Sequence, residues 1–376
     1  MTEQIHLHRR SEQSRHEEVL QDRPENTVVL TDIGRDSDDM MALVLGSRLV
    51  RDRTMDIKGV VSTLTPASRR AQLARYTLDM VGLSDVPVGV GSNIPSLGED
   101  QVHPYEFRGL PYRTEQKVTG SQIFERTLRQ VGDHSLNFLV IASFTDLSLY
   151  LARTQDAQEL FRKKVKNVII MGGVAVDDGQ VIRNGKGFFI PDTSANYQFD
   201  PEAAASAFDF FQASNIPMTL VSRHAVNAAQ LPRETLDTLG ETGHPVGQWL
   251  KNVSEEGFNS LWERSNLPAD DPSRALPARC DRAWFITTFC GGEQVQPGDP
   301  IWPHIKSISV YDPIAMLAVS PSLSETFFAP TEVLTMGTQH RIIGVSPEQT
   351  GVKNPGELQS FIRNGLVRAL QESLSQ

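Results

Sequence analysis

TVVLTDIGRDSDDMMAL, residues 27–43, joins an apolar, β-branched run to a helical pattern through a turn that is rich in aspartate. Four aspartates crowd this turn, namely Asp32, Asp36, Asp38 and Asp39. Helix capping and the helix dipole explain one or two of them, but the first turn has too few free N–H donors to explain all four. Carboxylates this close repel one another unless a cation neutralises them, and hard cations such as Ca²⁺ and Mg²⁺ prefer oxygen ligands. The turn therefore predicts a metal site at the carboxyl end of a strand.

The composition limits the partners that this chain can have. Its 376 residues carry a formal net charge of -10, with a pI near 5.4, and 39% of them are hydrophobic. The acidic balance argues against nucleic acid and against an anionic membrane surface, since both need a basic footprint. No stretch approaches the ~18 apolar residues of a membrane span. The two cysteines, Cys280 and Cys290, form no disulfide framework and suit a reducing compartment, so a cytoplasmic location is predicted.

The first 26 residues differ from the rest of the chain. They are polar, carry mixed charge and lack the apolar stretch of about 7–15 residues that a secretory signal needs. We expect residues 1–26 to form a polar N-terminal arm and residues 27–376 to form a single domain.

Strand and helix signals alternate along that domain. Amphipathic helical stretches follow or precede most of the strand-like runs, and continuous apolar strands that alternate with helices are typical of a parallel sheet covered on both faces. We therefore predict a doubly wound α/β fold with a mainly parallel central sheet. The strand-like runs lie at 27–32, 57–63, 86–91, 137–143, 167–173 and 217–222, with another inside 305–318 and a strand–turn–helix pattern from about residue 330.

The alternation fails between residues 231 and 303. All four tryptophans lie there, together with many Pro and Gly residues. We interpret this segment as an insertion over the carboxyl-terminal rim of the sheet. Lids and ligand-contacting loops have this composition, and so do helices packed on the rim.

In open parallel sheets ligands bind at the carboxyl ends of the strands. The strand ends here are Asp32 and residues 143–146, 171–173 and 222–224. Gly172 and Gly173 would permit close approach of a ligand to the backbone. Neither a dinucleotide-binding fingerprint nor a P-loop follows any strand, so redox chemistry and phosphoryl transfer are not expected.

Six motifs in this order resemble the inosine–uridine-preferring nucleoside hydrolase family. The resemblance spans about residues 28–370 and implies a calcium-dependent hydrolase that cleaves the N-glycosidic bond of a ribonucleoside or related ribosylated small molecule. It also implies a role in purine and pyrimidine salvage and a homodimer or homotetramer. The motifs are TDIGRDSDDMMAL (31–43), VHPYEFRGL (102–110), ASFTDLSLYL (142–151), NVIIMGG (167–173), TSANYQFDPEAA (193–204) and YDPIA (311–315).

The resemblance also implies a set of site residues. The calcium ligands would be Asp32, Asp39, the main-chain oxygen of Thr145 and Asp312. Asp32 would also accept a proton from the attacking water. For Thr145, a helix N-cap is the alternative interpretation, and the two roles are compatible.

Asp38 and Asn196 match residues that hold the ribose hydroxyls in the family. A carboxylate and an amide suit a vicinal diol, which donates to one and accepts from the other. A turn residue is the alternative for Asn196. Met171, at its strand end, is included among the substrate-contacting residues.

The sequence departs from the family pattern at both ends of the expected substrate. Ser194 stands where the family has a glutamate that holds the 5′-hydroxyl. Its shorter side chain either leaves room for a 5′-substituent or reaches the 5′-hydroxyl through a bridging water. Tyr311 replaces the histidine that precedes the late aspartate and that is proposed to protonate the base. His103 and His224 are candidates to replace it as the acid, and packing roles are the alternative for both.

A second function from another class also fits the sequence. A calcium- and ribose-binding or nucleoside-binding protein that has lost turnover would keep the same ligands and vary at the acid and 5′ positions. The presence of Asp32 favours the enzyme.

Overall fold

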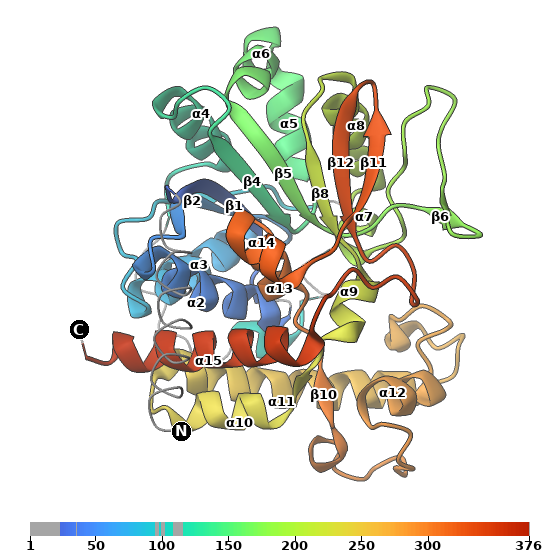
Figure 1. Ribbon diagram of the computed structural model, residues 1–376. Coiled ribbons are helices and arrows are strands. Elements are labelled where there is room, and N and C mark those ends of the chain that lie inside the picture. Colours follow the sequence, from blue (N-terminus) through green and yellow to red (C-terminus); the bar gives the residue numbers. More distant parts are fainter. Residues whose placement is uncertain (1–22, 35, 95–97, 99–101, 108–115, 376) are drawn as a thin grey trace, which may run out of the picture.

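The structure is a computed structural model that describes residues 23–34, 36–94, 98, 102–107 and 116–375. An eight-stranded sheet lies at its centre, in the order β11-β12-β8-β5-β4-β1-β2-β3 (Figure 1). Every neighbouring pair is parallel except β11 with β12, so the predicted fold class is confirmed. The strands are β1 (Glu25–Thr31), β2 (Met55–Ser62), β3 (Val88–Val90), β4 (Leu136–Ile141), β5 (Val165–Met171), β8 (Met218–Val221), β11 (Thr331–Thr335) and β12 (Thr338–Ile343).

Helices cover both faces of the sheet, because successive strand side chains point to opposite sides. On β1, Val29 enters one hydrophobic cluster while Val28 and Leu30 enter the other. Figure 1 shows the two helical layers on either side of the strands. The first layer contains α2 (Ser37–Arg51), α3 (Ala67–Met80), α13 (Tyr311–Leu317) and α15 (Pro355–Ser373), and the second contains α4 (Gly120–Gln130), α5 (Thr145–Arg153), α6 (Gln155–Lys164) and α8 (Pro201–Ala213).

Shorter elements complete the described chain. Two of the short strand pairs stand apart from the central sheet: β6 with β7 and β9 with β10. The remaining elements are β6 (Val176–Asp177), β7 (Gln180–Val181), β9 (Leu231–Pro232), β10 (Ser307–Ile308), α7 (Ala195–Gln198), α9 (Arg223–Ala228), α10 (Glu234–Glu241), α11 (Pro245–Ser265), α12 (Arg282–Phe289), α14 (Pro321–Phe327), and the 3₁₀ turns η3 (Pro104–Phe107), η4 (Pro272–Arg274) and η5 (Trp302–His304).

The apolar run within 305–318 does not join the central sheet, contrary to the sequence pattern. Only Ser307–Ile308 pairs, antiparallel to β9, and the chain enters α13 at Tyr311. Pro313 is compatible with that helix because a first helical turn does not need its N–H. Ile305 and Val310 are apolar because they are buried in the core beneath α13, and not because they extend the sheet.

Much of the segment 231–303 consists of packed helices. Leu239 of α10 and Leu250 of α11 are fully buried in the same hydrophobic cluster as α2 and α15. Trp249 and Trp262 are also buried there. The composition left two interpretations open, a ligand-contacting loop or helices packed on the rim. For α10 and α11 the structure shows packed helices.

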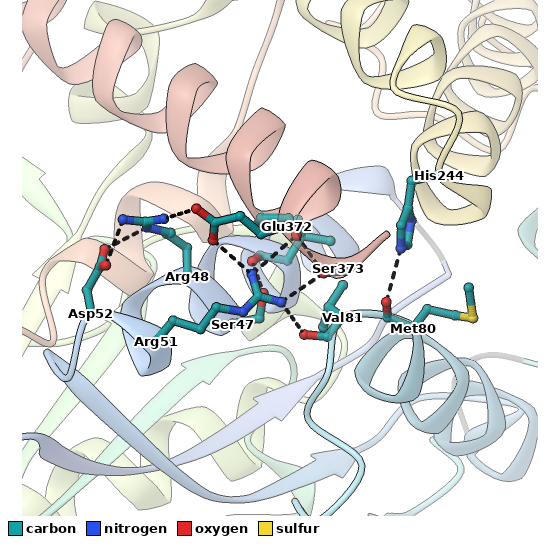
Figure 2. Close-up of polar contacts among 11 residues, drawn as sticks. Ser47, Arg48, Arg51, Asp52, Met80, Val81, His244, Glu372 and Ser373 are labelled. Atoms are coloured by element: carbon teal, nitrogen blue, oxygen red, sulfur yellow. Dashed lines mark hydrogen bonds and ion pairs between the residues drawn. The ribbon is translucent and has the colours of Figure 1, made fainter. Parts of the chain in front are cut away.

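Polar contacts fasten the C-terminal helix to the last turn of α2 (Figure 2). Arg48 binds Glu372 at 2.5 Å and Asp52 at 2.7 Å. Arg51 donates to the hydroxyl of Ser373 at 2.8 Å. Because α2 also begins at the aspartate turn, these contacts hold the far end of the helix that carries that turn.

His244 fastens α11 to the end of α3 (Figure 2). Its Nδ1 accepts the amide hydrogen of Val246 at 3.1 Å, so its Nε2 carries the proton that is donated to the carbonyl of Met80 at 3.0 Å. Burial lowers the pKa of His244, which keeps this neutral tautomer in place. This hydrogen bond anchors the start of α11 to the end of α3.

Several predictions concern the chain ends and the thiols. Residues 1–22 of the predicted arm lie outside the described residues, whereas Glu25 and Asn26, which were assigned to that arm, already belong to β1. Cys280 and Cys290 are buried and form no disulfide. In the part of the chain that is described, no helix combines the length and the apolar character needed to cross a bilayer.

The pH dependence of stability should report on His340 of β12. This side chain is fully buried, and its Nδ1 accepts the amide hydrogen of Met218 at 3.2 Å. Burial lowers its pKa from 6.5 to about 4, with a contribution from Arg183. Since the folded pKa lies below the unfolded one, the stabilisation is complete above pH 6.5 and is lost as the pH falls toward 4. The loss should approach about 3 kcal/mol.

Urea unfolding of the wild type and of His340→Gln across this pH range measures the effect. The variant should show a flatter dependence of unfolding free energy on pH. Gln339→Asn, at the exposed and non-titrating neighbour on β12, serves as the matched control and should follow the wild-type curve. Parallel curves for the wild type and His340→Gln would contradict the assignment.

Candidate metal and ribose site

The sheet contains a topological switch point between β1 and β4. The chain leaves β1 toward β2 and β3 on one side, and leaves β4 toward β5 and β8 on the other. A crevice forms at such a point beyond the carboxyl ends of the strands. Asp32 follows the last residue of β1, and Thr145 lies four residues after the end of β4. The aspartate turn therefore lies where the fold opens.

Three carboxylates from two distant parts of the chain meet there. Asp38 and Asp39 lie in the first turn of α2, and Asp312 lies in the first turn of α13, which packs on α2. One oxygen from each of the three lies within 4.8 Å of the others, and all three side chains are buried. This cluster is called the carboxylate cluster below.

Backbone and hydroxyl donors orient the cluster. The Thr31 hydroxyl and the Asp32 amide both donate to Oδ1 of Asp39, the amide at 3.1 Å. The amide of Tyr311 donates to Oδ2 of Asp38 at 3.1 Å, which links α13 to α2. The strand end, the turn and the late helix thus hold the carboxylates in defined rotamers.

The electrostatics of the cluster favour a bound cation. Burial, together with the nearby carboxylates of Asp36 and Asp32, raises the pKa of Asp38 to about 7. Burial and the neighbouring carboxylates also raise the pKa values of Asp39 and Asp312 well above 3.8. Closely spaced, buried oxygen donors of this kind suit a hard divalent cation. The residues present therefore fit a metal ion of the calcium or magnesium type.

A buried arginine supports the aspartate turn from behind. Arg70 of α3 is fully buried and donates to the carbonyl of Asp32 at 2.9 Å and to that of Thr65 at 3.0 Å. It also forms a buried ion pair at 2.7 Å with Glu106, whose other oxygen accepts the amide hydrogen of His103 at 2.9 Å. One side chain thus holds both the aspartate turn and the segment that carries His103. In the sequence, Arg70 is one of several polar residues of an amphipathic helix. Nothing in that pattern indicates that its side chain is buried and ion-paired.

The structure contradicts one of the two roles expected for Thr145. The helix begins at Thr145 itself, so the interpretation of Thr145 as an N-cap is wrong. Its hydroxyl donates to Oδ2 of Asp200 at 2.7 Å, and Asp200 caps α8. This side-chain bond fixes the position of the residue, whose main-chain oxygen was predicted as a metal ligand.

Asn196 lies within the short helix α7 and not in a turn. Its Nδ2 donates to the carbonyl of Met171 at 3.2 Å, which ties it to the end of β5. Gly172, with a φ of +155°, lies so close to Tyr197 that a Cβ would come within 2.4 Å of that ring. Close packing against Tyr197 therefore requires a glycine at this position.

A cavity of about 720 Å³, called the carboxylate chamber, collects most of the predicted site residues. Asp36 and two exposed residues, Pro277 and Arg279, also line it. The predicted residues along its walls are Asp32, Asp38, Asp39, Met171, Ser194, Asn196, Tyr311 and Asp312.

A second cavity of about 240 Å³, called the aromatic chamber, adjoins the first and shares Asp36, Asp38 and Tyr311 with it. Tyr105 and Phe258 supply aromatic surface, and the remaining walls include Ser254, Gly257, Leu261 and Phe289. None of the four tryptophans lines this chamber. No motif or spacing in the sequence singled out Phe258, because its position on this wall depends on how α11 packs over the rim.

His224 and His103 are not among the residues that line the carboxylate chamber. His224 lines a third cavity of about 340 Å³, called the Arg223 chamber, which shares Thr193 and Arg223 with the carboxylate chamber. Burial lowers the pKa of His224. His103 stacks on Tyr105 with ring centroids 5.1 Å apart, so it lies beside the aromatic chamber.

Tyr311 stands between the first two chambers. Burial raises the pKa of its phenol, and the carboxylate of Asp38 adds to this shift. The phenol therefore stays protonated at neutral pH and can donate a hydrogen bond, although it is a weak acid.

Comparisons with known proteins agree with this geometry. The model of a family described as inosine-uridine preferring nucleoside hydrolase matches residues 28–354. The non-specific ribonucleoside hydrolase RihC of Klebsiella pneumoniae is 26% identical over 173 residues, which cover 43% of this chain. The match spans about half the length of that curated relative, 51%.

Solved structures resemble the whole chain. The type III effector protein XopQ, complexed with adenosine diphosphate ribose, has a TM-score of 0.79 at 28% identity and covers 96% of this chain and 99% of its own. The effector protein XOO4466 has a TM-score of 0.76 at 28% identity, with the same coverage. A purine-preferring ribonucleoside hydrolase from Gardnerella vaginalis, 14% identical, covers 92% of this chain and 99% of its own with a TM-score of 0.59, which shows the shared fold.

Calcium binding should release protons. The raised pKa values of Asp38, Asp39 and Asp312 mean that a cation must displace protons from the cluster, so calcium affinity should rise with pH. The pKa of about 7 for Asp38 places part of this rise near neutral pH. Titration calorimetry in two buffers with different ionisation enthalpies measures the released protons. Asp39→Asn should abolish calcium binding, whereas Asp156→Asn, an exposed control on α6, should not. Equal heats of calcium binding in the two buffers would show that no protons are released and would contradict this prediction.

Arg70→Met should destabilise the fold, because it leaves the buried carboxylate of Glu106 without its cationic partner. The expected loss is about 3–5 kcal/mol in denaturant unfolding. Adding Glu106→Gln to Arg70→Met should recover part of the loss. Arg69→Met, at the exposed neighbour, is the matched control and should cost much less. A loss for Arg70→Met no larger than for Arg69→Met would show that the buried pair contributes little.

Proposed function

Because the chain belongs to the inosine-uridine preferring nucleoside hydrolase family, we propose that it hydrolyses the N-glycosidic bond of a ribonucleoside or a related ribosylated small molecule in a calcium-dependent reaction. The observation that carries this proposal is the carboxylate chamber. Carboxylates that are distant in sequence converge at the switch point of the sheet, and Asn196 lines the same cavity. The salvage role and the homo-oligomer that the resemblance implies are part of the proposal, as is the cytoplasmic location that the cysteine content predicts.

Breaking a ribosyl C–N bond builds positive charge on the sugar. The carboxylate cluster is suited to stabilise that charge electrostatically, because its orientation is set before the substrate arrives. Asp32, Asp39, Asp312 and the carbonyl of Thr145 would hold calcium. When bound, calcium would lower the pKa of a coordinated water and orient it. Asp32 would accept the proton of the water as its oxygen bonds to the anomeric carbon, and the C–N electron pair would leave with the base.

Asp38 and Asn196 would hold the ribose diol. Asp38 accepts hydrogen bonds from hydroxyl groups, and the amide of Asn196 both donates and accepts. Removal of the 2′-hydroxyl would leave a buried carboxylate without its partner, so deoxyribonucleosides should be poor substrates.

The aromatic chamber would take the leaving base. Tyr105 and Phe258 offer aromatic surface on which a planar base can stack. Tyr311, at the boundary with the carboxylate chamber, would donate a hydrogen bond to the departing base. His103, beside Tyr105, is the candidate for a general acid. His224 lines the Arg223 chamber and is therefore assigned to the other end of the substrate, as a binding residue.

A second function is supported by one of the similar structures. XopQ is described as an effector protein and was solved with adenosine diphosphate ribose. A chain of this fold would then bind a ribosylated ligand without turning it over. The retained Asp32 favours the hydrolase.

Release of free ribose from a panel of purine and pyrimidine ribonucleosides, with calcium and with excess chelator, tests the proposal. We expect release that the chelator abolishes and that Asp32→Asn lowers by several orders of magnitude, because the variant loses both a metal ligand and the base. Asp156→Asn should retain wild-type release. If no panel member releases ribose while calcium and a ribosylated ligand still bind, the binding function replaces the hydrolase.

A further inference from the structure

The three chambers adjoin one another in a fixed order. The aromatic and carboxylate chambers share Asp36, Asp38 and Tyr311, while the carboxylate and Arg223 chambers share Thr193 and Arg223. The carboxylate chamber therefore lies between the other two. A ligand with its ribose over the carboxylates has an aromatic wall toward one end and the Arg223 chamber toward the other.

The wall that the carboxylate chamber shares with the Arg223 chamber carries a positive charge, that of Arg223. Arg223, the first residue of α9, and Arg279, before α12, are the two Lys or Arg residues on the walls of the carboxylate chamber, as far as the structure describes it. Asp192 is the one carboxylate on the walls of the Arg223 chamber within the described residues. The guanidinium of Arg223 lies on the same walls as this carboxylate, and Arg279 adds a second positive charge to the carboxylate chamber.

The contacts of Arg223 leave its guanidinium available to a ligand. Its Nη2 lies 3.4 Å from Oδ2 of Asp192 and 3.2 Å from the hydroxyl of Thr193, both long for charge-assisted hydrogen bonds. The other oxygen of Asp192 accepts from the amide of Ser194 at 2.8 Å and from the Ser194 hydroxyl. The Arg223 side chain is 36% exposed, so its planar donor face is accessible.

Ser194 lies on the same wall, between Asp192 and Asn196. Its hydroxyl donates to Asp192, so it contributes no negative charge to the cavity. A neutral 5′-hydroxyl group needs no guanidinium partner, whereas a phosphate ester is matched by the bidentate geometry of arginine. The chain as a whole carries a formal net charge of -10, so an anionic ligand requires local cations of this kind.

We propose that the Arg223 chamber, with the wall that it shares with the carboxylate chamber, is a subsite for an anionic group on the ribose O5′, and that Arg223 binds it. The substrate is then a nucleoside 5′-phosphate or 5′-diphosphate derivative. Thr193 and neutral His224 supply further hydrogen bonds on the same wall. This inference rests on the proposed function, because it assumes that the ribose occupies the carboxylate chamber.

Binding of ribose and of ribose 5-phosphate tests the subsite without any turnover, since neither sugar contains an N-glycosidic bond. Calorimetry on the full chain with calcium should show that ribose 5-phosphate binds at least about tenfold more tightly than ribose. Arg223→Gln should remove most of this preference and leave the affinity for ribose unchanged. Arg223→Lys keeps the positive charge but loses the planar, bidentate guanidinium. It should give an intermediate preference for ribose 5-phosphate over ribose.

Arg341→Gln, at an exposed arginine on β12, is the matched control and should retain the full preference. Adenosine 5′-monophosphate and adenosine diphosphate ribose, compared with adenosine, distinguish a monoester from a diphosphate. Equal binding of the two sugars, binding of neither, or an equal loss of both in Arg223→Gln overturns the subsite. Failure of the proposed function is a separate result, because it is the absence of ribose release from every ribosyl compound, including the 5′-phosphates.

Discussion

Mutual repulsion among the buried carboxylates of Asp38, Asp39 and Asp312 is the constraint around which this end of the molecule is arranged. Charges that lie within 4.8 Å of one another away from water are costly unless donors and a cation offset them. The protein supplies the donors from the Thr31 hydroxyl and the amides of Asp32 and Tyr311. The parallel sheet, the packing of α13 on α2 and the buried Arg70 all serve to keep this arrangement in place.

The same repulsion among carboxylates determines which part of the proposed substrate can lie at each position along the rim. A carboxylate floor suits a cation and a sugar that becomes positively charged, and it is unsuited to an anionic group or to an apolar base. The two flanking chambers have the complementary character, because one presents Tyr105 and Phe258 and the other presents Arg223. In the proposed function, the base, the ribose and the 5′ substituent would each meet a wall of matching chemistry.

The sequence predicted those parts of the structure that are encoded locally. The six strands and the aspartates of the first turn follow from short apolar runs and from carboxylates in excess of capping needs. The pairing of Asp312 with them was inferred only through the family resemblance, since α13 is contributed from far along the chain. The prediction of a strand around Ile305 and Val310 was wrong because buried coil and buried strand have the same apolar composition. Arg70, Phe258 and Arg279 carried no signal, since their roles depend on tertiary contacts between α3, α11 and the segment before α12.

The most direct test of the central claim is a crystal structure grown with calcium, with the ion located by its anomalous scattering. The account predicts one peak at the cluster, about 2.3–2.6 Å from carboxylate oxygens of Asp32, Asp39 and Asp312 and from the carbonyl of Thr145. A cluster that stays free of calcium at saturating concentration, with its carboxylates neutralised by protons instead, would contradict it.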